Sequence, residues 1–212
     1  MRTILLLNPK GGCGKTTLAT NIASFYARRG HRVVLADFDP QGSSLEWLAA
    51  RPKKLQPIQG IAAWEESLRV PRQCEFLVMD APAAVYGKEI SALVRRAQSV
   101  ILPVLPSPID IRAASHFIHD LLLVGKVSRR QTKIAVVANR VRENTLIYHR
   151  LESFLKQLQI PFLTSLRDTQ NYIRAAERGL GIFELAPSLV ESDLEQWKPL
   201  TRWLNSKRSL PD

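Results

Sequence analysis

Three glycines and two lysines lie close together near the start of the chain, directly after a short apolar run. The residues in order are Leu5-Leu6-Leu7-Asn8-Pro9-Lys10-Gly11-Gly12-Cys13-Gly14-Lys15-Thr16-Thr17. Glycines let the backbone approach a polyphosphate closely and adopt torsions that a Cβ atom disfavours. Lys15 can reach the β- and γ-phosphates, and the hydroxyl of Thr16 can ligate Mg²⁺ at the start of a helix. The spacing therefore predicts a phosphate-binding loop.

Carboxylates follow two later apolar runs at the point where each run ends. Asp37 and Asp39 come after 33–36, and Asp80 comes after 76–79. In an open α/β sheet, ligands bind at the carboxyl ends of the strands, so we expect these carboxylates to face the same crevice as the loop. An aspartate that ends an apolar strand is typical of Mg²⁺ binding through a water or the threonine hydroxyl.

Apolar runs alternate with segments of helical periodicity along the whole chain. We expect strands within 2–8, 31–36, 74–79, 99–104, 133–138 and 160–164, with a helix at 15–29 after the first of them. This alternation predicts one α/β domain over 1–212, P-loop NTPase-like, with a mostly parallel sheet and helices on both faces. Pro161 favours an edge position for the last strand, because proline donates no ladder hydrogen bond.

Two other segments carry weaker signals. Between 52 and 72 the pattern indicates only a possible short helix at 62–68, and no role can be assigned to that span. Near the C-terminus, Ser188 and Glu191 predict a capping box for a last helix, which Pro199 should interrupt or kink.

The segments 10–17, 37–41 and 80–82 together resemble the ParA/MinD superfamily of ATPases with a deviant Walker A loop. The absence of a DNA-reading segment before the first strand makes the chain most similar to short ParA-type partition and positioning ATPases. The resemblance implies an ATPase that requires Mg²⁺, with a slow intrinsic rate that DNA and a small adaptor protein stimulate. It also implies a homodimer with ATP sandwiched between the subunits.

The resemblance implies a role for individual residues. Lys10 would reach the partner subunit's nucleotide, Lys15 would bind the phosphates, and Asp39 would orient or activate the attacking water. Thr16 and Asp80 would hold Mg²⁺, while Asp37 would support the Mg²⁺ shell or the loop. Asn139, with Arg140 beside it, would contact the adenine edge. The expected nucleotide contacts are Gly11, Gly12, Cys13, Gly14, Lys15, Thr16, Thr17, Asn139 and Arg140.

The chain is strongly basic, with 30 Lys and Arg against 19 Asp and Glu, a formal net charge of +11 and a pI near 10.1. A nucleotide site alone does not need that excess of positive charge. The excess suggests a polyanionic partner such as DNA. Any contact with DNA should be independent of sequence, through phosphates. The candidates lie in the C-terminal part of the chain: Arg167, Arg174, Arg178, Arg202, Lys207 and Arg208. A solvated charged face is the alternative interpretation of these residues.

Two other functions compete with a DNA-bound switch that partitions or positions plasmid, chromosomal or protein cargo. A metabolic P-loop ligase or kinase would use Lys15 and Asp39 similarly, but it has no need of the basic excess. A membrane-positioning ATPase of the MinD kind needs a terminal amphipathic helix, and 205–212 is too polar and short for one. The first strand leads directly into the loop, so we expect no cleaved signal peptide. We also expect no membrane partner and a cytoplasmic, nucleoid-associated protein.

Overall fold

A computed structural model describes residues 1–83, 85, 87–124, 132–142, 145–158 and 160–211. Among these residues, seven strands form a single sheet in the order β3-β2-β4-β1-β5-β6-β7, and every neighbouring pair is parallel. The strands are β1 (Arg2–Leu6), β2 (Val33–Asp37), β3 (Ile58–Ala62), β4 (Phe76–Asp80), β5 (Ser99–Val104), β6 (Lys133–Val141) and β7 (Phe162–Arg167). The expected parallel α/β sheet is confirmed.

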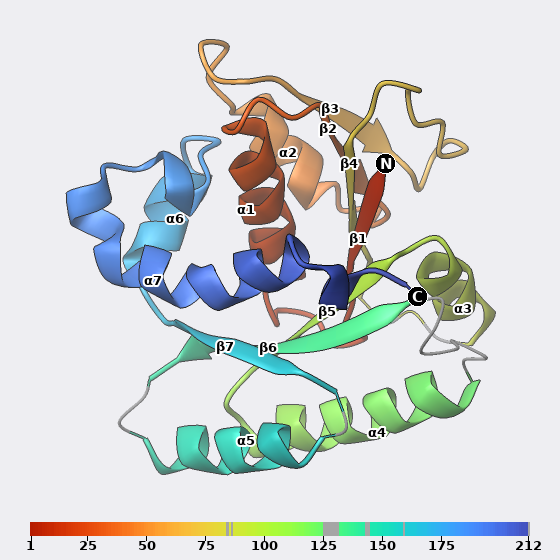
Figure 1. Ribbon diagram of the computed structural model, residues 1–212, viewed down its shortest axis with the longest axis vertical. Coiled ribbons are helices and arrows are strands. Elements are labelled where there is room, and N and C mark those ends of the chain that lie inside the picture. The colour runs from red at the N-terminus through yellow and green to blue at the C-terminus, as the bar shows by residue number, and fades with distance from the viewer. Residues whose placement is uncertain (84, 86, 125–131, 143–144, 159, 212) are drawn as a thin grey trace.

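Helices cover both faces of the sheet (Figure 1). They are α1 (Lys15–Ala27), α2 (Ser43–Ala49), α3 (Lys88–Arg95), α4 (Pro108–Val124), α5 (Leu146–Gln157), α6 (Gln170–Ala176) and α7 (Pro187–Leu204), with short 3₁₀ turns η1 (Ile182–Glu184) and η2 (Lys207–Ser209). None of the described helices is long and apolar enough to cross a membrane.

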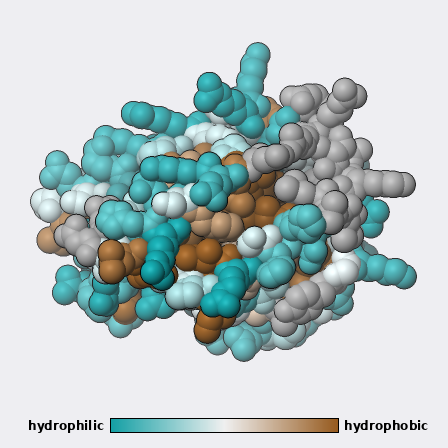
Figure 2. Space-filling view, turned by 90° about the horizontal axis from the view of Figure 1, so that it is seen from below, coloured by the Kyte–Doolittle hydropathy of each residue, from teal (hydrophilic) through white to brown (hydrophobic). Residues whose placement is uncertain are grey.

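Alternate residues of the central strands pack into two separate cores. Leu5 of β1 faces the core under α3, α4 and α5, whereas Ile4 and Leu6 face the core under α1 and α7. Successive side chains of a strand point to opposite faces, so a strand buried on both sides reads as a continuous apolar run. Figure 2 shows the outer face of the α4–α5 layer, where apolar side chains gather between hydrophilic ones.

Two sequence expectations were wrong. The helix expected at 62–68 is absent from the described residues, and the weak segment instead contains β3, an edge strand parallel to β2. The capping box at Ser188 is also absent, because α7 begins at Pro187 with Ala186 as its N-cap residue. The backbone leaves helical torsions at Val190 (φ −128°, ψ 15°), and the helix continues through Pro199.

The sheet order brings the acidic strand ends next to the loop. β4 lies between β1 and β2, with Leu6 beside Asp80 and Asp80 beside Asp37 in the register. The loop that follows β1 and the carboxylates that end β2 and β4 therefore share one edge of the sheet, as expected.

Candidate nucleotide site

The loop between β1 and α1 has the backbone torsions of a phosphate cradle. Gly12 and Gly14 have φ of 75° and 96°, and Gly14 is the N-cap residue of α1 without a side-chain cap. A Cβ atom on Gly14 would lie 2.1 Å from Asn139 Nδ2, so only glycine fits there. The first-turn N–H groups of α1 are thus available to an anion.

Cys13 is a buried structural residue of this loop. Its Sγ lies 3.3 Å from the carbonyl oxygen of Lys10, to which the thiol donates, and burial raises the pKa of the thiol. A thiol with a raised pKa is a poor nucleophile, so its side chain supports the loop.

The two lysines of the loop have different partners. Lys15 is buried, and its Nζ donates to the carbonyl oxygen of Lys10 at 3.2 Å. Lys10 is more exposed and forms an ion pair with Asp110, with 2.8 Å between Nζ and Oδ1. Asp110 lies in the first turn of α4, where its backbone N–H donates to Ser107 Oγ at 3.1 Å. Ser107 thus caps the start of α4, and Asp110 has a second role as the partner of Lys10.

Asp80 is almost completely buried and only half satisfied. Its Oδ2 accepts from Thr16 Oγ1 and from Ser44 Oγ, each at 2.7 Å, whereas its buried Oδ1 has no hydrogen-bond partner in the part of the chain that the structure describes. Burial raises the pKa of Asp80 to about 6. A buried carboxylate oxygen without a partner is unfavourable unless a ligand or cation satisfies it.

Asp37 holds the segment that follows β2. Its Oδ1 accepts from the backbone N–H of Asp39 at 3.0 Å, and its Oδ2 accepts from that of Ser44 at 2.9 Å. Burial raises the pKa of Asp37, and these N–H groups partly offset that effect. Both oxygens of Asp37 are thus engaged with the loop, which favours loop support over metal ligation.

Asp39 lies in that loop with its side chain partly buried. Its Oδ1 accepts from the backbone N–H of Gln41 at 3.0 Å, and the loop ends at Gly42, the left-handed N-cap residue of α2. Oδ2 of Asp39 has no hydrogen-bond partner among the described residues, so it can accept from a substrate or a water.

A hollow of about 310 Å³ opens beside the loop. It is lined by Gly12, Gly14, Thr17, Asn139, Arg140, Arg167, Asp168, Thr169, Tyr172 and Ile173. Asn139 is buried and donates from Nδ2 to the carbonyl oxygen of Cys13 at 2.8 Å. Arg140 has a φ of 52°, and Asp168 forms ion pairs with Arg140 and Arg142. Asn139 and Arg140, which the sequence predicts to lie at the adenine base, thus line one cavity with the loop glycines.

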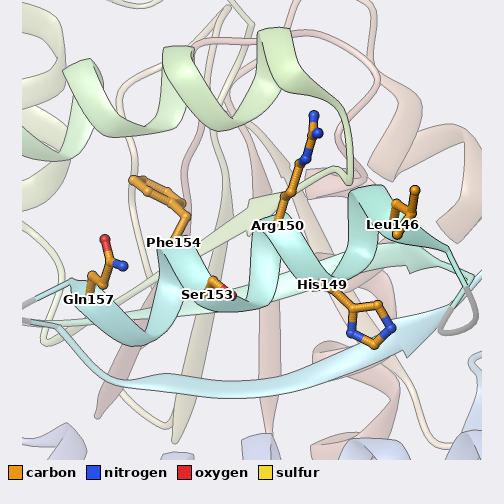
Figure 3. A pocket seen from close by; sticks show the side chains of 6 residues that line it. All are labelled: Leu146, His149, Arg150, Ser153, Phe154 and Gln157. Carbon is orange, nitrogen blue, oxygen red and sulfur yellow. The ribbon is translucent and has the colours of Figure 1, made fainter.

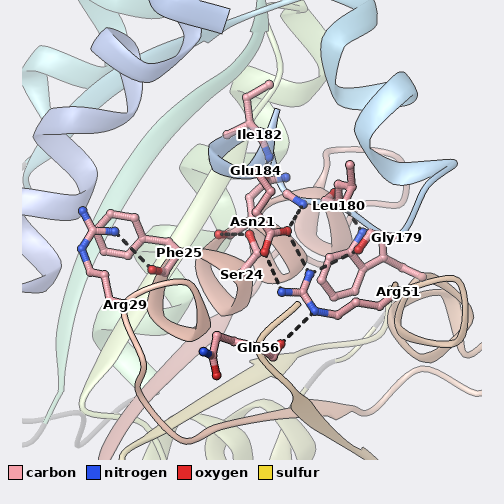
Figure 4. A network of polar contacts seen from close by, with 12 residues as sticks. Asn21, Ser24, Phe25, Arg29, Arg51, Gln56, Gly179, Leu180, Ile182 and Glu184 are labelled. Carbon is pink, nitrogen blue, oxygen red and sulfur yellow. Dashed lines mark hydrogen bonds and ion pairs between the residues drawn. The ribbon is translucent and has the colours of Figure 1, made fainter. Parts of the chain in front are cut away.

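A buried polar network connects α1 and α2 with the turn before η1 (Figure 4). Arg51 forms an ion pair with Glu184, with 2.6 Å between NH2 and Oε1, and both side chains are about 5% exposed or less. Glu184 also accepts from the N–H of Gly181, and Asn21 accepts from the N–H of Ile182. The network fixes the C-terminal end of α2 against the segment that follows α6.

The six basic residues proposed for DNA contact do not lie on one surface. Arg167 forms a bidentate ion pair with the buried Asp193, so its charge is largely neutralised. Arg174 and Arg178 lie in and after α6, near the carboxyl ends of the strands, and are exposed. Arg202 lies in the last turn of α7. Lys207 and Arg208 lie in η2, beside the amino ends of β1 and β5.

Another hollow, of about 460 Å³, lies along α5 (Figure 3). Arg150 points toward α4 and His149 points to the other side of α5, so the polar groups do not converge on one point. The site therefore lies at the loop and not here.

Ser44 and Asp110 were not assigned to the site by sequence reasoning. Ser44 follows the acidic segment closely and is the second residue of a helix that begins after a glycine, which is a usable signal. The contact between Asp110 and Lys10 joins residues 100 positions apart and has no local signal.

Comparisons with known proteins agree with this geometry. The profile of the CobQ/CobB/MinD/ParA nucleotide-binding domain, CbiA, matches residues 4–182. The chain is 30% identical over 196 residues to the maintenance of carboxysome distribution protein A of Halothiobacillus neapolitanus, covering 86% of this chain and 87% of that protein.

Two solved structures share the fold. One is a putative plasmid partition protein of Borrelia burgdorferi bound to AMPPNP, with a TM-score of 0.74, 14% identity, and coverage of 95% of this chain and 98% of that one. The other is the MinD cell division protein of Aquifex aeolicus, with a TM-score of 0.72, 19% identity and 96% coverage of both chains. With a family profile spanning most of its length and a phosphate cradle at the expected strand end, this chain belongs to the CobQ/CobB/MinD/ParA nucleotide-binding domain family.

Proposed function

We propose that the protein is an ATP-dependent dimerising switch that binds DNA without sequence preference and positions a cargo while it hydrolyses ATP. The observation that carries the nucleotide part is the buried Oδ1 of Asp80, which has no hydrogen-bond partner among the described residues, while Oδ2 of the same carboxyl accepts from the Thr16 hydroxyl. The relatives support the cargo part, since one maintains carboxysome distribution and a structural neighbour is a putative plasmid partition protein.

The residues present fit Mg²⁺ with ATP. Mg²⁺ takes hard oxygen ligands, keeps several waters and needs only one or two protein carboxylates. Thr16 and Asp80 offer such oxygens, and no larger cluster of metal-binding side chains is present in the described residues. When bound, Mg²⁺ would neutralise charge that develops on the phosphate oxygens.

Each step of ATP binding and hydrolysis is assigned to particular residues of this chain. The ammonium group of Lys15 leaves the Lys10 carbonyl and pairs with the β- and γ-phosphates, while the hollow beside Asn139 takes the base. Asp39 accepts a hydrogen bond from the water that attacks the γ-phosphorus. The bond to the β-phosphate oxygen breaks, giving ADP and inorganic phosphate. Asp37 keeps the Asp39 loop in place through its two backbone hydrogen bonds.

Dimerisation requires a change of partner at Lys10. In the single subunit Lys10 is paired with Asp110, and in the sandwich dimer it would leave Asp110 for the partner subunit's nucleotide. An ion pair of this exposure contributes about 1 kcal/mol or less, so a triphosphate can readily replace it.

Three variants test the proposal in parallel. Lys15→Ala should lose nucleotide affinity in calorimetry, and Lys10→Ala should bind nucleotide but remain monomeric in light scattering with a non-hydrolysed analogue. Asp39→Ala should bind Mg²⁺-ATP, dimerise and fail to release phosphate. Wild-type affinity in Lys15→Ala, or normal dimerisation of Lys10→Ala, contradicts the assigned roles.

The DNA part has its own assay, a gel shift on unrelated plasmid fragments with ADP, ATP or the analogue. We expect the Asp39→Ala protein to stay on DNA in ATP, because it cannot leave the dimeric state. Binding to anionic vesicles with no binding to DNA favours a membrane-positioning ATPase. Turnover of a small-molecule phosphate acceptor without dimerisation favours a metabolic enzyme.

A further inference from the structure

Exposed basic side chains lie at both ends of the strands, but the buried carboxylates of the nucleotide site lie at one end only. Asp37, Asp80 and Asp110 lie at the carboxyl ends of the strands around the nucleotide site. The opposite edge of the sheet is basic, and we call it the amino-end basic surface. Its six defining residues are exposed: Arg28, Arg29, Arg32, Arg96, Lys207 and Arg208.

Hydrogen bonds and an ion pair connect the segments that carry these residues, although the segments are far apart in sequence. The backbone N–H of Arg2 donates to the carbonyl oxygen of Glu75, whose side chain pairs with Arg32 at 3.6 Å. The guanidinium group of Arg2 donates to the carbonyl oxygen of Ser209 in η2, and so does the hydroxyl of Ser99 at the start of β5. The starts of β2, β4, β1 and β5 therefore meet η2 on one surface.

The end of α1 belongs to the same surface. The hydroxyl of Tyr26 donates to Asn205 Oδ1 at 3.1 Å, and the Tyr26 ring stacks on Phe76 at the start of β4, with 3.7 Å between centroids. Arg28 and Arg29 follow directly after α1. In Figure 1 both chain termini lie on the same side of the molecule as α3, whose C-cap residue is Arg96.

Most of this charge is not neutralised by the protein. Glu75 pairs with Arg32 and with His31, and Arg29 lies over the Phe25 ring at 3.5 Å. Within the described ranges, no carboxylate partner is present for Arg28, Arg96, Lys207 or Arg208. Basic residues at helix C-termini do complement the helix dipole, but that effect needs one residue and not a continuous group.

Arg2 adds a buried positive charge beneath the surface. Its NH2 donates to the carbonyl oxygens of Leu204 and Ser209, whereas its Nε and NH1 are buried and have no hydrogen-bond partner among the described residues. A partly desolvated cation of this kind strengthens the positive potential above it.

We propose that the amino-end basic surface binds the phosphate backbone of duplex DNA. This inference rests on the DNA partner of the proposed function. Five of its six residues are arginines, whose planar guanidinium groups match phosphate geometry. A lipid surface would also require bulky apolar side chains, and of the described exposed ones only Met1 lies at this end, at the start of β1.

This placement changes how ATP would control DNA binding. A nucleotide sandwich joins two subunits at their carboxyl ends, so the two amino-end basic surfaces point away from each other. One dimer would then hold two DNA segments, and the gain on dimerisation would come from two linked contacts and not from one continuous surface. Fragments too short to reach both ends should show little benefit from ATP.

The test uses a variant of the full chain that removes three charges from the surface, Arg28→Gln/Arg96→Gln/Arg208→Gln. The affinity for a labelled 24-base-pair duplex is measured by anisotropy from 50 to 200 mM salt, with ADP and with a non-hydrolysed ATP analogue. Losing three phosphate contacts lowers the salt slope by about 2.7, so the fourfold rise in salt weakens binding by about fortyfold less than in wild type.

A matched control removes three exposed charges elsewhere, Arg150→Gln/Arg174→Gln/Arg178→Gln. It should keep the wild-type slope to within about one. Both variants should keep the wild-type unfolding temperature and nucleotide affinity, because the exchanged side chains are exposed.

The outcomes separate the two proposals. If the control loses as much of the salt slope as the amino-end variant, or more, this surface is wrong while DNA binding stands. If wild type binds vesicles of phosphatidylcholine and phosphatidylglycerol but not DNA, the occupant proposed here and the DNA part of the function are both wrong. If wild type binds neither vesicles nor DNA, the DNA occupant and the DNA part of the function are wrong as well. Light scattering then tests nucleotide-dependent dimerisation separately.

Discussion

Glu184→Gln tests whether the buried network of Figure 4 stabilises the fold. The substitution keeps the shape of the side chain but removes its charge, leaving the Arg51 guanidinium buried without an anion. Breaking a buried ion pair by removing one partner costs about 3–5 kcal/mol. For a chain of 212 residues the entropy of unfolding is about 0.45 kcal/mol/K, so the unfolding temperature should fall by about 7–11 °C.

The measurement is thermal unfolding followed by circular dichroism at several scan rates. Glu195→Gln is the matched control, because Glu195 pairs with Lys198 on the exposed side of α7. An exposed pair contributes less than about 1 kcal/mol, which corresponds to less than about 2 °C here. The double variant Arg51→Met/Glu184→Leu should recover most of the loss, because neither buried charge remains. If Glu184→Gln shifts the transition no further than Glu195→Gln, the network is not a stabilising element.

Three further outcomes follow from the structure. Gly14→Ala should weaken nucleotide binding at least about tenfold, because its Cβ would displace Asn139. Gly30 has a similar φ of 84° but open space around it, so Gly30→Ala should cost only about 1 kcal/mol of stability and leave nucleotide binding unchanged. Asp110→Asn should lower the unfolding temperature of the nucleotide-free protein by up to about 2 °C, because it removes the charged partner of Lys10 but keeps the backbone N–H that donates to Ser107 Oγ; an unchanged unfolding temperature would contradict a stabilising ion pair. Burial raises the pKa of Tyr26 to about 12, so the stabilising effect of the buried neutral phenol is complete below pH 10 and is lost as pH rises toward 12. Tyr26→Phe should reduce this alkaline loss of the free energy of unfolding, measured by urea titration. An unchanged pH profile would refute the assignment of the loss to Tyr26.

The sequence was most informative where the signal is local. The loop from Lys10 to Thr17 could be predicted because its glycines, lysines and threonines have a spacing typical of a phosphate-binding loop, and Gly12 and Gly14 have the positive φ that such a loop uses. The central strands are buried on both faces and read as uninterrupted apolar runs, which also made the parallel sheet predictable. The roles of Asp39, Asn139 and Lys10 toward a nucleotide remain predictions.

The edge strand β3 was missed because its pattern is neither continuous nor alternating. Only Ile58 and Ile61 are buried, and Gly60 stands in the middle of the strand. A Cβ on Gly60 would lie 2.7 Å from Leu45 Cδ2, so a larger residue at this position requires the Leu45 side chain of α2 to move. Such a requirement depends on a tertiary neighbour and leaves no periodic signal in the sequence.

The distribution of charge shows the same limit on a larger scale. Arg167, Arg174, Lys207 and Arg208 all lie in the C-terminal part of the chain and were therefore named together as DNA candidates, yet the first two lie at the carboxyl edge of the sheet and the last two at the amino edge. Arg2 and Ser209 stand at opposite ends of the chain and are hydrogen-bonded. In a parallel α/β fold each helix that connects two successive strands returns the chain to the amino edge, so basic residues at the ends of these helices gather there from distant parts of the sequence. Carboxylates that bind a metal must instead follow strands, because ligands enter at the carboxyl edge. The overall excess of positive charge can thus be counted from the composition, but its separation from the nucleotide site follows only from the topology.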